Sequence, residues 1–229
     1  MDIRDDTAAG STGRRQPDPQ QLLTALTTEH FTLQGARSQT ISETAARASV
    51  YVFSVSSALV ALGFIAQISA VGDLFNTFAL TVLPTLYFLG VVTYVRLVES
   101  GGEDYRYGMA INRIRHYYKE IAGDREDLFL LSGYDDGHGV FENMGIPAEG
   151  RTPIFAFSTA IDVLNGVVGG AAVAIALGAL VDAPLGWAAG AGVVAAVASV
   201  VGWIRYADQM LEARAAMDKP LFPTPRAPG

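Results

Sequence analysis

The segment IFAFSTAIDVLNGVVGGAAVAIALGALVDAPLGWAAGAGVVAAVASVVGWI, residues 154–204, is apolar over most of its length. It contains two apolar runs, Ile154–Val181 and Leu185–Ile204, separated by the turn Asp182–Pro184, which has no Lys or Arg. Each run has about 20 residues or more, which is enough for a helix to cross ~30 Å of hydrocarbon. This half of the chain therefore predicts two membrane-spanning helices joined by a tight turn.

A second pair of runs, Val50–Val71 and Leu74–Val98, repeats the pattern around the turn Gly72–Asp73. All 16 Lys and Arg residues lie outside the two turns. Because basic residues accumulate on the cytoplasmic side of a membrane, both termini and the middle loop 99–153 are expected to be cytoplasmic. The sequence predicts an all-α, polytopic membrane protein of the bacterial inner membrane, with four transmembrane helices in two hairpins and a cytoplasmic helical layer.

The composition excludes several classes of function. The chain of 229 residues has a formal net charge of −7, so it offers no basic face for nucleic acid. It has no Cys, which excludes disulfides, thiol catalysis and Cys-based metal centres. Phosphate-binding, nucleophile-elbow and zinc-protease motifs do not occur. The sequence indicates no cofactor, no metal and no catalytic residue.

Changes of composition predict five regions. They are a disordered tail over 1–21, a juxtamembrane helix with the first two spans over 22–98, a helical cytoplasmic loop over 99–153, the last two spans with a cytoplasmic extension over 154–217, and a disordered tail over 218–229 that is rich in Pro.

The middle loop is patterned as helix rather than as linker. Apolar residues at 107, 111, 114, 118 and 121 follow a helical spacing, and Gly123 would end that helix. A second short helix is expected from Asp124 through Leu131. A third would begin after Asp135 or Asp136 and stop at Gly145.

The segment Tyr134–Gly139 has two readings. Its carboxylates and His138 superficially resemble a metal site, but zinc sites need three or four ligands, usually His or Cys. Capping of a helix by Asp135 or Asp136 explains the same residues more simply.

Asp162 is the main candidate for an intramembrane site. Ser158, Asp162 and Asn165 share one face of the third span, and ionisable groups inside a membrane are functional by default. They could line a water-filled path or bind a cation. Alternatively, the span begins near Ile161, which would place Asp162 among the headgroups or give it a structural role.

The remaining candidates concern contact and packing. Arg113, Arg115 and Lys119 could touch lipid headgroups or a partner, or form a solvated helix face. The pairs Gly166/Gly170 and Gly186/Gly190 have the spacing that lets membrane helices pack closely.

Parts of the chain resemble a group of uncharacterised actinobacterial membrane proteins. The resemblance rests on TLQGARSQTISE at 32–43, Arg47–Ser49, Ala110–Arg115 and Tyr134–Asp136, and it extends over most of 28–206. It implies no activity. The architecture is also similar to that of small membrane effectors of bacterial nucleotide-signalled defence systems, an analogy without a shared motif.

Three functions are therefore expected, in decreasing order of support. The first is a non-enzymatic membrane protein that contacts the bilayer and acts through its cytoplasmic layer, by self-association or by binding a cytoplasmic protein. The second is a small ion channel or transporter that uses the polar face of the third span. An enzyme is third.

Overall fold

The fold is an elongated bundle of helices, seen in a computed structural model that describes residues 18–68, 72–145 and 154–225. The long helices are α1 (Pro19–Ala66), α2 (Gly72–Ala122), α4 (Ile154–Val181) and α5 (Leu185–Met217), and the short ones are η1 (Gly123–Leu128) and α3 (Gly137–Asn143). Regular structure in these ranges is helical throughout, as the all-α prediction requires. Each long helix contains a stretch that is long and apolar enough to span a membrane.

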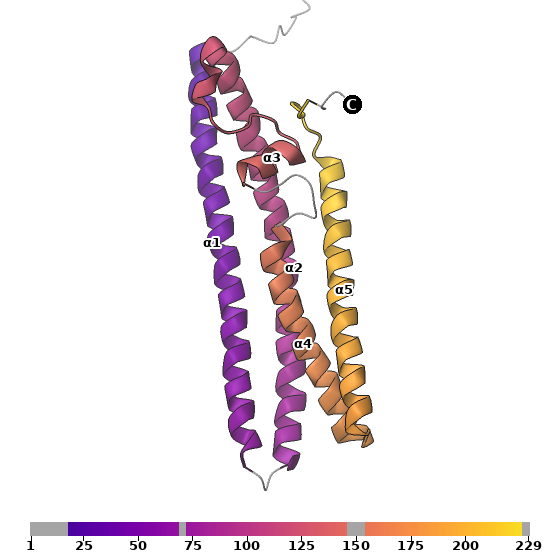
Figure 1. The fold of residues 1–229 in the computed structure, drawn as a ribbon. Coiled ribbons are helices and arrows are strands. Elements are labelled where there is room, and N and C mark those ends of the chain that lie inside the picture. The colour runs from indigo at the N-terminus through magenta and orange to yellow at the C-terminus, as the bar shows by residue number, and fades with distance from the viewer. Residues whose placement is uncertain (1–17, 69–71, 146–153, 226–229) are drawn as a thin grey trace, which may run out of the picture.

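The helices pack in sequence-adjacent pairs. α1 packs along α2, and α4 packs along α5. α2 also packs on α4, so these two helices join the two pairs (Figure 1). The ends of α1 and α4 and the beginnings of α2 and α5 lie at one end of the molecule, at the bottom of Figure 1. The short elements η1 and α3 and the C-terminal segment lie toward the other end.

One stripe of α1 faces the bundle over the whole length of the helix. Its buried and half-buried residues recur every three or four positions, as a helix packed on one side requires. Along this stripe lie Leu22, Leu26, His30, Leu33, Arg37, Thr40, Thr44, Ala48, Tyr51, Val55, Ala58, Leu62 and Ile65, and the half-buried Ala36, Ser54 and Ala61 lie beside it. The expected juxtamembrane helix and first span are therefore one continuous helix.

The start of α1 corrects the predicted N-terminal boundary. The side chain of Asp18 accepts a hydrogen bond from the backbone N–H of Gln20 at 3.1 Å, and Pro19 occupies the first helical position. Residues 19–21, predicted to be disordered, are therefore helical. The rest of that predicted tail, 1–17, lies outside the described residues.

α2 does not end where the second apolar run ends. It continues past Val98 to Ala122, so the predicted boundary at residue 98 falls inside a helix. Of the predicted apolar stripe, Ile111 and Ile114 are buried and the tyrosines at 107 and 118 are half-buried. The stripe ends before Ile121, which is 56% exposed.

The end of α2 and the two short elements agree only in part with prediction. Gly123 ends the helix, as expected, with a positive φ of 53°. The predicted second helix is only the 3₁₀ turn η1, and Leu130 beyond it is 95% exposed. The third helix forms as α3, and Asp136 caps it by accepting from the N–H of Gly139 at 2.9 Å.

Close packing of α4 on α5 uses only one of the two predicted glycine pairs. A Cβ added at Gly170 would lie 2.4 Å from the carbonyl oxygen of Gly192, and one at Gly166 would lie 3.1 Å from that of Ala196. Gly186 and Gly190 have no atom within 4 Å of such a Cβ among the described residues. The prediction that this second pair packs the helices is therefore wrong within the chain. Gly192 lies on the face of α5 toward α4, whereas Gly186 and Gly190 are exposed.

Candidate functional site

The polar face predicted on the third span is buried inside the bundle. Ser158, Asp162 and Asn165 of α4 are 5%, 1% and 1% exposed. The Oδ1 atom of Asn165 accepts a hydrogen bond from the Tyr51 hydroxyl of α1 at 2.9 Å. The same amide lies so close to α2 that a Cβ at Gly90 would be 2.0 Å from its oxygen. Asn165 thus joins three helices.

Asp162 differs from its two neighbours. Both carboxyl oxygens are buried, and neither has a hydrogen-bond partner among the residues that the structure describes. A buried polar group without a partner costs about 1–3 kcal/mol, and a charged one costs more. The carboxyl is therefore held in place by the packing around it, at a cost to stability.

A cavity of about 350 Å³ lies one helical turn from Asp162. Ser158 lines it from α4, two threonines line it from α1, and Ser100 and Asp104 line it from α2. Asp104 is also held by Arg37, whose Nε and Nη2 donate to its two oxygens at 2.7 and 3.1 Å. Ile41, Ala45 and Leu97 also line this pocket, whose wall is mostly apolar. Asp162 is not among its lining residues, and both of its carboxyl oxygens are buried.

The polar face does not continue along α4 in the other direction. One turn beyond Asn165 is Gly169, where an added Cβ would lie 2.7 Å from the ring of Tyr87. That ring covers the helix, and its hydroxyl pairs with the Ser199 hydroxyl at 2.9 Å. The polar face of α4 therefore ends at Asn165.

The basic residues expected to touch headgroups or a partner lie largely within the fold. Arg115 donates to Asn112 Oδ1 at 2.7 Å and to the carbonyl of Ser132 at 3.2 Å. Arg113 forms an ion pair with the buried Asp135 and donates to the carbonyl of Lys219 at 2.7 Å. Lys119 is half-buried. Loop and tail segments of the chain itself thus contact the two arginines, and their contact with headgroups or a partner stays a prediction.

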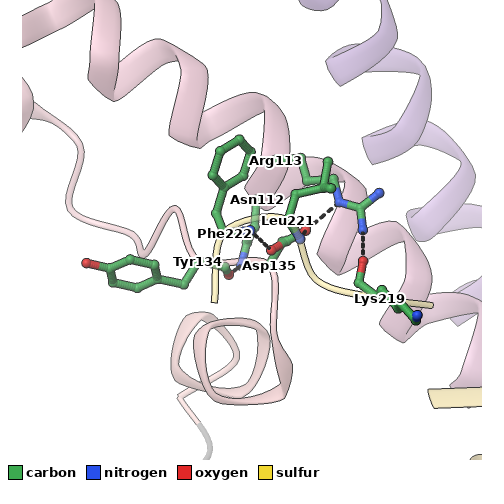
Figure 2. Close-up of polar contacts among 7 residues, drawn as sticks. All are labelled: Asn112, Arg113, Tyr134, Asp135, Lys219, Leu221 and Phe222. Carbon is green, nitrogen blue, oxygen red and sulfur yellow. Dashed lines mark hydrogen bonds and ion pairs between the residues drawn. The ribbon is translucent and has the colours of Figure 1, made fainter. Parts of the chain in front are cut away.

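The second site is formed by Asp135 and Asp136, the residues that had suggested a metal site. Together they hold the C-terminal segment, and the pair is called the clamp below. Asp135 is fully buried, and its oxygens accept the backbone N–H groups of Leu221 at 2.9 Å and Phe222 at 2.7 Å, together with Nε of Arg113 (Figure 2). Its own N–H donates to the carbonyl of Phe222 at 3.1 Å. Burial raises the pKa of Asp135, but these hydrogen bonds outweigh it and hold the pKa below its ordinary value.

Asp136 holds the next part of the same segment. Its Oδ2 accepts the N–H of Thr224 and its Oδ1 accepts the threonine hydroxyl, each at 2.8 Å. The ring of Phe222 stacks on the imidazole of His116, with centroids 3.8 Å apart and an angle of 17°. Residues 218–225, predicted to be a disordered tail, thus lie in defined contacts. The prediction failed because the partners of the tail are remote in sequence.

Asn112 fixes the clamp on α2. Its Nδ2 donates to the carbonyl of Tyr134 at 2.7 Å, next to Asp135, as Figure 2 shows. Its Oδ1 accepts from Asn143 of α3 at 2.9 Å, and Asn143 in turn binds the backbone of Ser132. Asn112 was not among the site residues predicted from the sequence. A polar residue beside Ile111 in an otherwise apolar stripe was the available signal.

Comparison with protein-family models, with curated proteins and with solved structures finds no match. A proposal for the function of the chain therefore rests on its geometry.

Proposed function

We propose that this chain is a four-span protein of the bacterial inner membrane that acts without catalysis, by contact of its cytoplasmic helical layer with a second copy of itself or with a protein partner. Four points support the proposal, and they concern the surface of the helices, the distribution of charge, the length of α1 and α2, and the apolar tip at their far end.

The outward surfaces favour insertion into a bilayer. In the last third of α1, Val52, Phe53, Val60 and Phe64 are between 42% and 73% exposed. Beyond the turn at 182–184, Trp187 and Val194 of α5 are 80% and 68% exposed. Apolar surface of this extent would be unfavourable in water and is favourable against lipid.

The charge distribution favours one orientation. The ends of the helices at the bottom of Figure 1 carry Asp73 and Asp182 but no Lys or Arg, whereas the other end carries Arg37, Arg106 and Arg113. By the rule that basic residues stay inside, η1, α3 and both termini are cytoplasmic.

The first two helices, α1 and α2, are too long to lie entirely within a membrane. α1 has 48 residues and α2 has 51. At 1.5 Å per residue such helices are about 72–77 Å long, more than twice the ~30 Å of hydrocarbon. The pair therefore projects into the cytoplasm, and Arg37 and Asp104 bind each other across it.

The observation that carries the proposal is the apolar tip of this projection. Ile121, Leu128, Leu130 and Leu131 are 56%, 66%, 95% and 42% exposed. They lie at the end of α2 that is farthest from the proposed spans, beyond the reach of lipid. Exposed leucines in water mark a contact surface.

Native mass spectrometry in detergent, with crosslinking in membranes, tests the proposal. The wild type should form a dimer or larger assembly, and Leu128→Asp with Leu130→Asp should shift it to monomer. Ile41→Asp, which changes an exposed apolar residue nearer the spans, is the matched control and should leave the assembly intact. A wild type that is monomeric in both measurements contradicts self-association, and retention of a cytoplasmic protein that the tip variant loses would then identify the contact as heterologous.

The second candidate function is an ion conduit, and Asp162 is the observation that favours it. Its buried carboxyl has no hydrogen-bond partner among the described residues, and it lies one turn from Ser158, which lines a pocket of about 350 Å³. Purified protein in liposomes should show no cation or proton flux under the leading proposal. A flux that Asp162→Asn abolishes would replace that proposal with the conduit.

A further inference from the structure

The C-terminal segment is matched to the Asp135–Asp136 clamp at the level of its backbone. Within Pro220–Pro225, only Leu221, Phe222 and Thr224 have a backbone N–H, because the other three residues are proline. All three N–H groups donate to a carboxylate of the clamp. The prolines occupy the positions at which no donor is used.

The prolines also prepare the segment for binding. Proline fixes φ near −65° and favours an extended chain, so less conformational entropy is lost when the segment is immobilised. Recognition of proline-rich peptides commonly exploits this preformed extension. The prolines after α5 therefore do more than end the helix. They leave free the three N–H groups that bind the two adjacent carboxylates.

Side chains contribute at two positions only. Phe222 stacks on His116, and the Thr224 hydroxyl donates to Asp136. Leu221 is 65% exposed, so that residue is held by its N–H rather than by its side chain. A segment that is held mainly by polar contacts at the edge of the fold can be exchanged without unfolding a core.

We infer that the Asp135–Asp136 clamp is a peptide-recognition site for extended, proline-spaced segments, and that the chain fills it with its own residues 219–224 as a releasable latch. The latch holds the end of α5 against α2 and α3. Arg214, which donates to the carbonyl of Glu99 at 3.0 Å, and the ion pair between Arg106 and Asp218 at 3.0 Å support the same attachment. Release of the segment both frees α5 at this end and vacates a site with a defined preference. The inference does not depend on self-association through the leucine tip.

A fluorescent peptide with the sequence of residues 218–225 tests the inference by anisotropy. The receptor is the full-length chain carrying Leu221→Pro and Phe222→Ala, which disable its own segment. We expect saturable binding to this variant and binding at least about tenfold weaker to the wild type, because the wild-type segment competes in cis. Asp136→Ala, added to the disabled chain, should weaken peptide binding.

Two changes at one peptide position provide the matched control. A peptide with Leu221→Ala keeps the N–H and should bind within about threefold of the parent, because the side chain is mostly exposed. A peptide with Leu221→Pro lacks the N–H and should bind at least about tenfold more weakly, since a hydrogen bond to a charged group is lost. These variants leave the protein unchanged, so folding does not affect the comparison. Equal binding of the two peptides, or no saturable binding to the disabled chain, would overturn the inference. The leucine-tip experiment would not be affected by either result.

Discussion

Two aspartates in this molecule are equally buried but have opposite surroundings. Asp135 is 0% exposed and accepts two backbone N–H groups and an arginine. Asp162 is 1% exposed, and its oxygens have no hydrogen-bond partner in the described part of the chain. Burial alone therefore does not define the role of a carboxyl group. The difference lies in the donors that the fold directs to it.

The regions around the two aspartates differ in the hydrogen bonds that the fold provides. Around Asp135, loop, helix and tail segments converge, and each contributes a donor or an acceptor. Around Asp162, packing encloses the carboxyl but does not bond to it, although Asn165 one turn away is bonded to Tyr51. Asp162 is therefore a carboxyl that the fold encloses at a cost, whereas Asp135 is a carboxyl whose donors bind the C-terminal segment.

Asp135→Asn should have the largest effect. The variant removes the charge that faces Arg113 and one acceptor for the segment N–H groups. The latch should weaken by at least about 1.5–3 kcal/mol, the range for one hydrogen bond to a charged group. Amide exchange at Leu221, Phe222 and Thr224 measures it. Asp127→Asn, at an exposed position of η1, should leave that exchange unchanged.

Acid should release the same latch, but only at very low pH. The pKa of Asp135 is lowered in the folded chain, so its contribution is fully present above the ordinary carboxyl value of 3.8 and is lost as pH falls through the lower folded value. Protection of residues 221–224 should thus persist from pH 7 to about pH 4. Loss of protection near pH 6 would show that the carboxylate is not stabilised as described.

His30 has a hydrogen-bond partner at only one of its two ring nitrogens among the described residues, so its surroundings are intermediate between those of the two aspartates. Its Nε2 contacts the Gln34 amide at 2.8 Å, but its buried Nδ1 has no partner among the described residues. Burial, followed by repulsion from Arg115, lowers the pKa of His30. The unfolded chain therefore binds the proton more readily, and stability should decline as pH falls below the ordinary value of 6.5.

Thermal unfolding in detergent between pH 7.5 and 5.5 measures this effect. His30→Gln cannot take up the proton and should flatten the decline. A wild type whose melting temperature does not change over this interval would contradict the described surroundings of His30.

Asp162→Asn should have the smallest effect. It replaces a buried carboxyl to which no described residue donates, so the free energy of unfolding should change by less than about 1 kcal/mol or rise slightly. Asn165→Asp is the matched comparison, because it places a second carboxyl beside the Tyr51 hydroxyl and Gly90 and should destabilise clearly. A large loss of stability in Asp162→Asn would mean that the carboxyl has a partner and that the contrast with Asp135 is wrong.

Local sequence patterns predicted much of this fold and little of its tertiary detail. Apolar runs, the stop at Gly123 and the cap at Asp136 are short-range signals, and the structure has each of them. The latch was not predictable, since Leu221 binds a residue 86 positions earlier in the chain. Likewise, spacing alone suggested Gly186 and Gly190, whereas the rotation of α5 directs Gly192 toward α4.

We propose that the two aspartates lie in different environments, Asp162 within four membrane spans and Asp135 in a cytoplasmic layer. Single Cys residues at Asp73, His138 and Ala183 of this Cys-free chain, probed with an impermeant thiol reagent in intact cells, test it most directly. Positions 73 and 183 should react from outside, and position 138 only after the cells are permeabilised. Reaction of position 138 in intact cells, with 73 and 183 silent, would contradict the account.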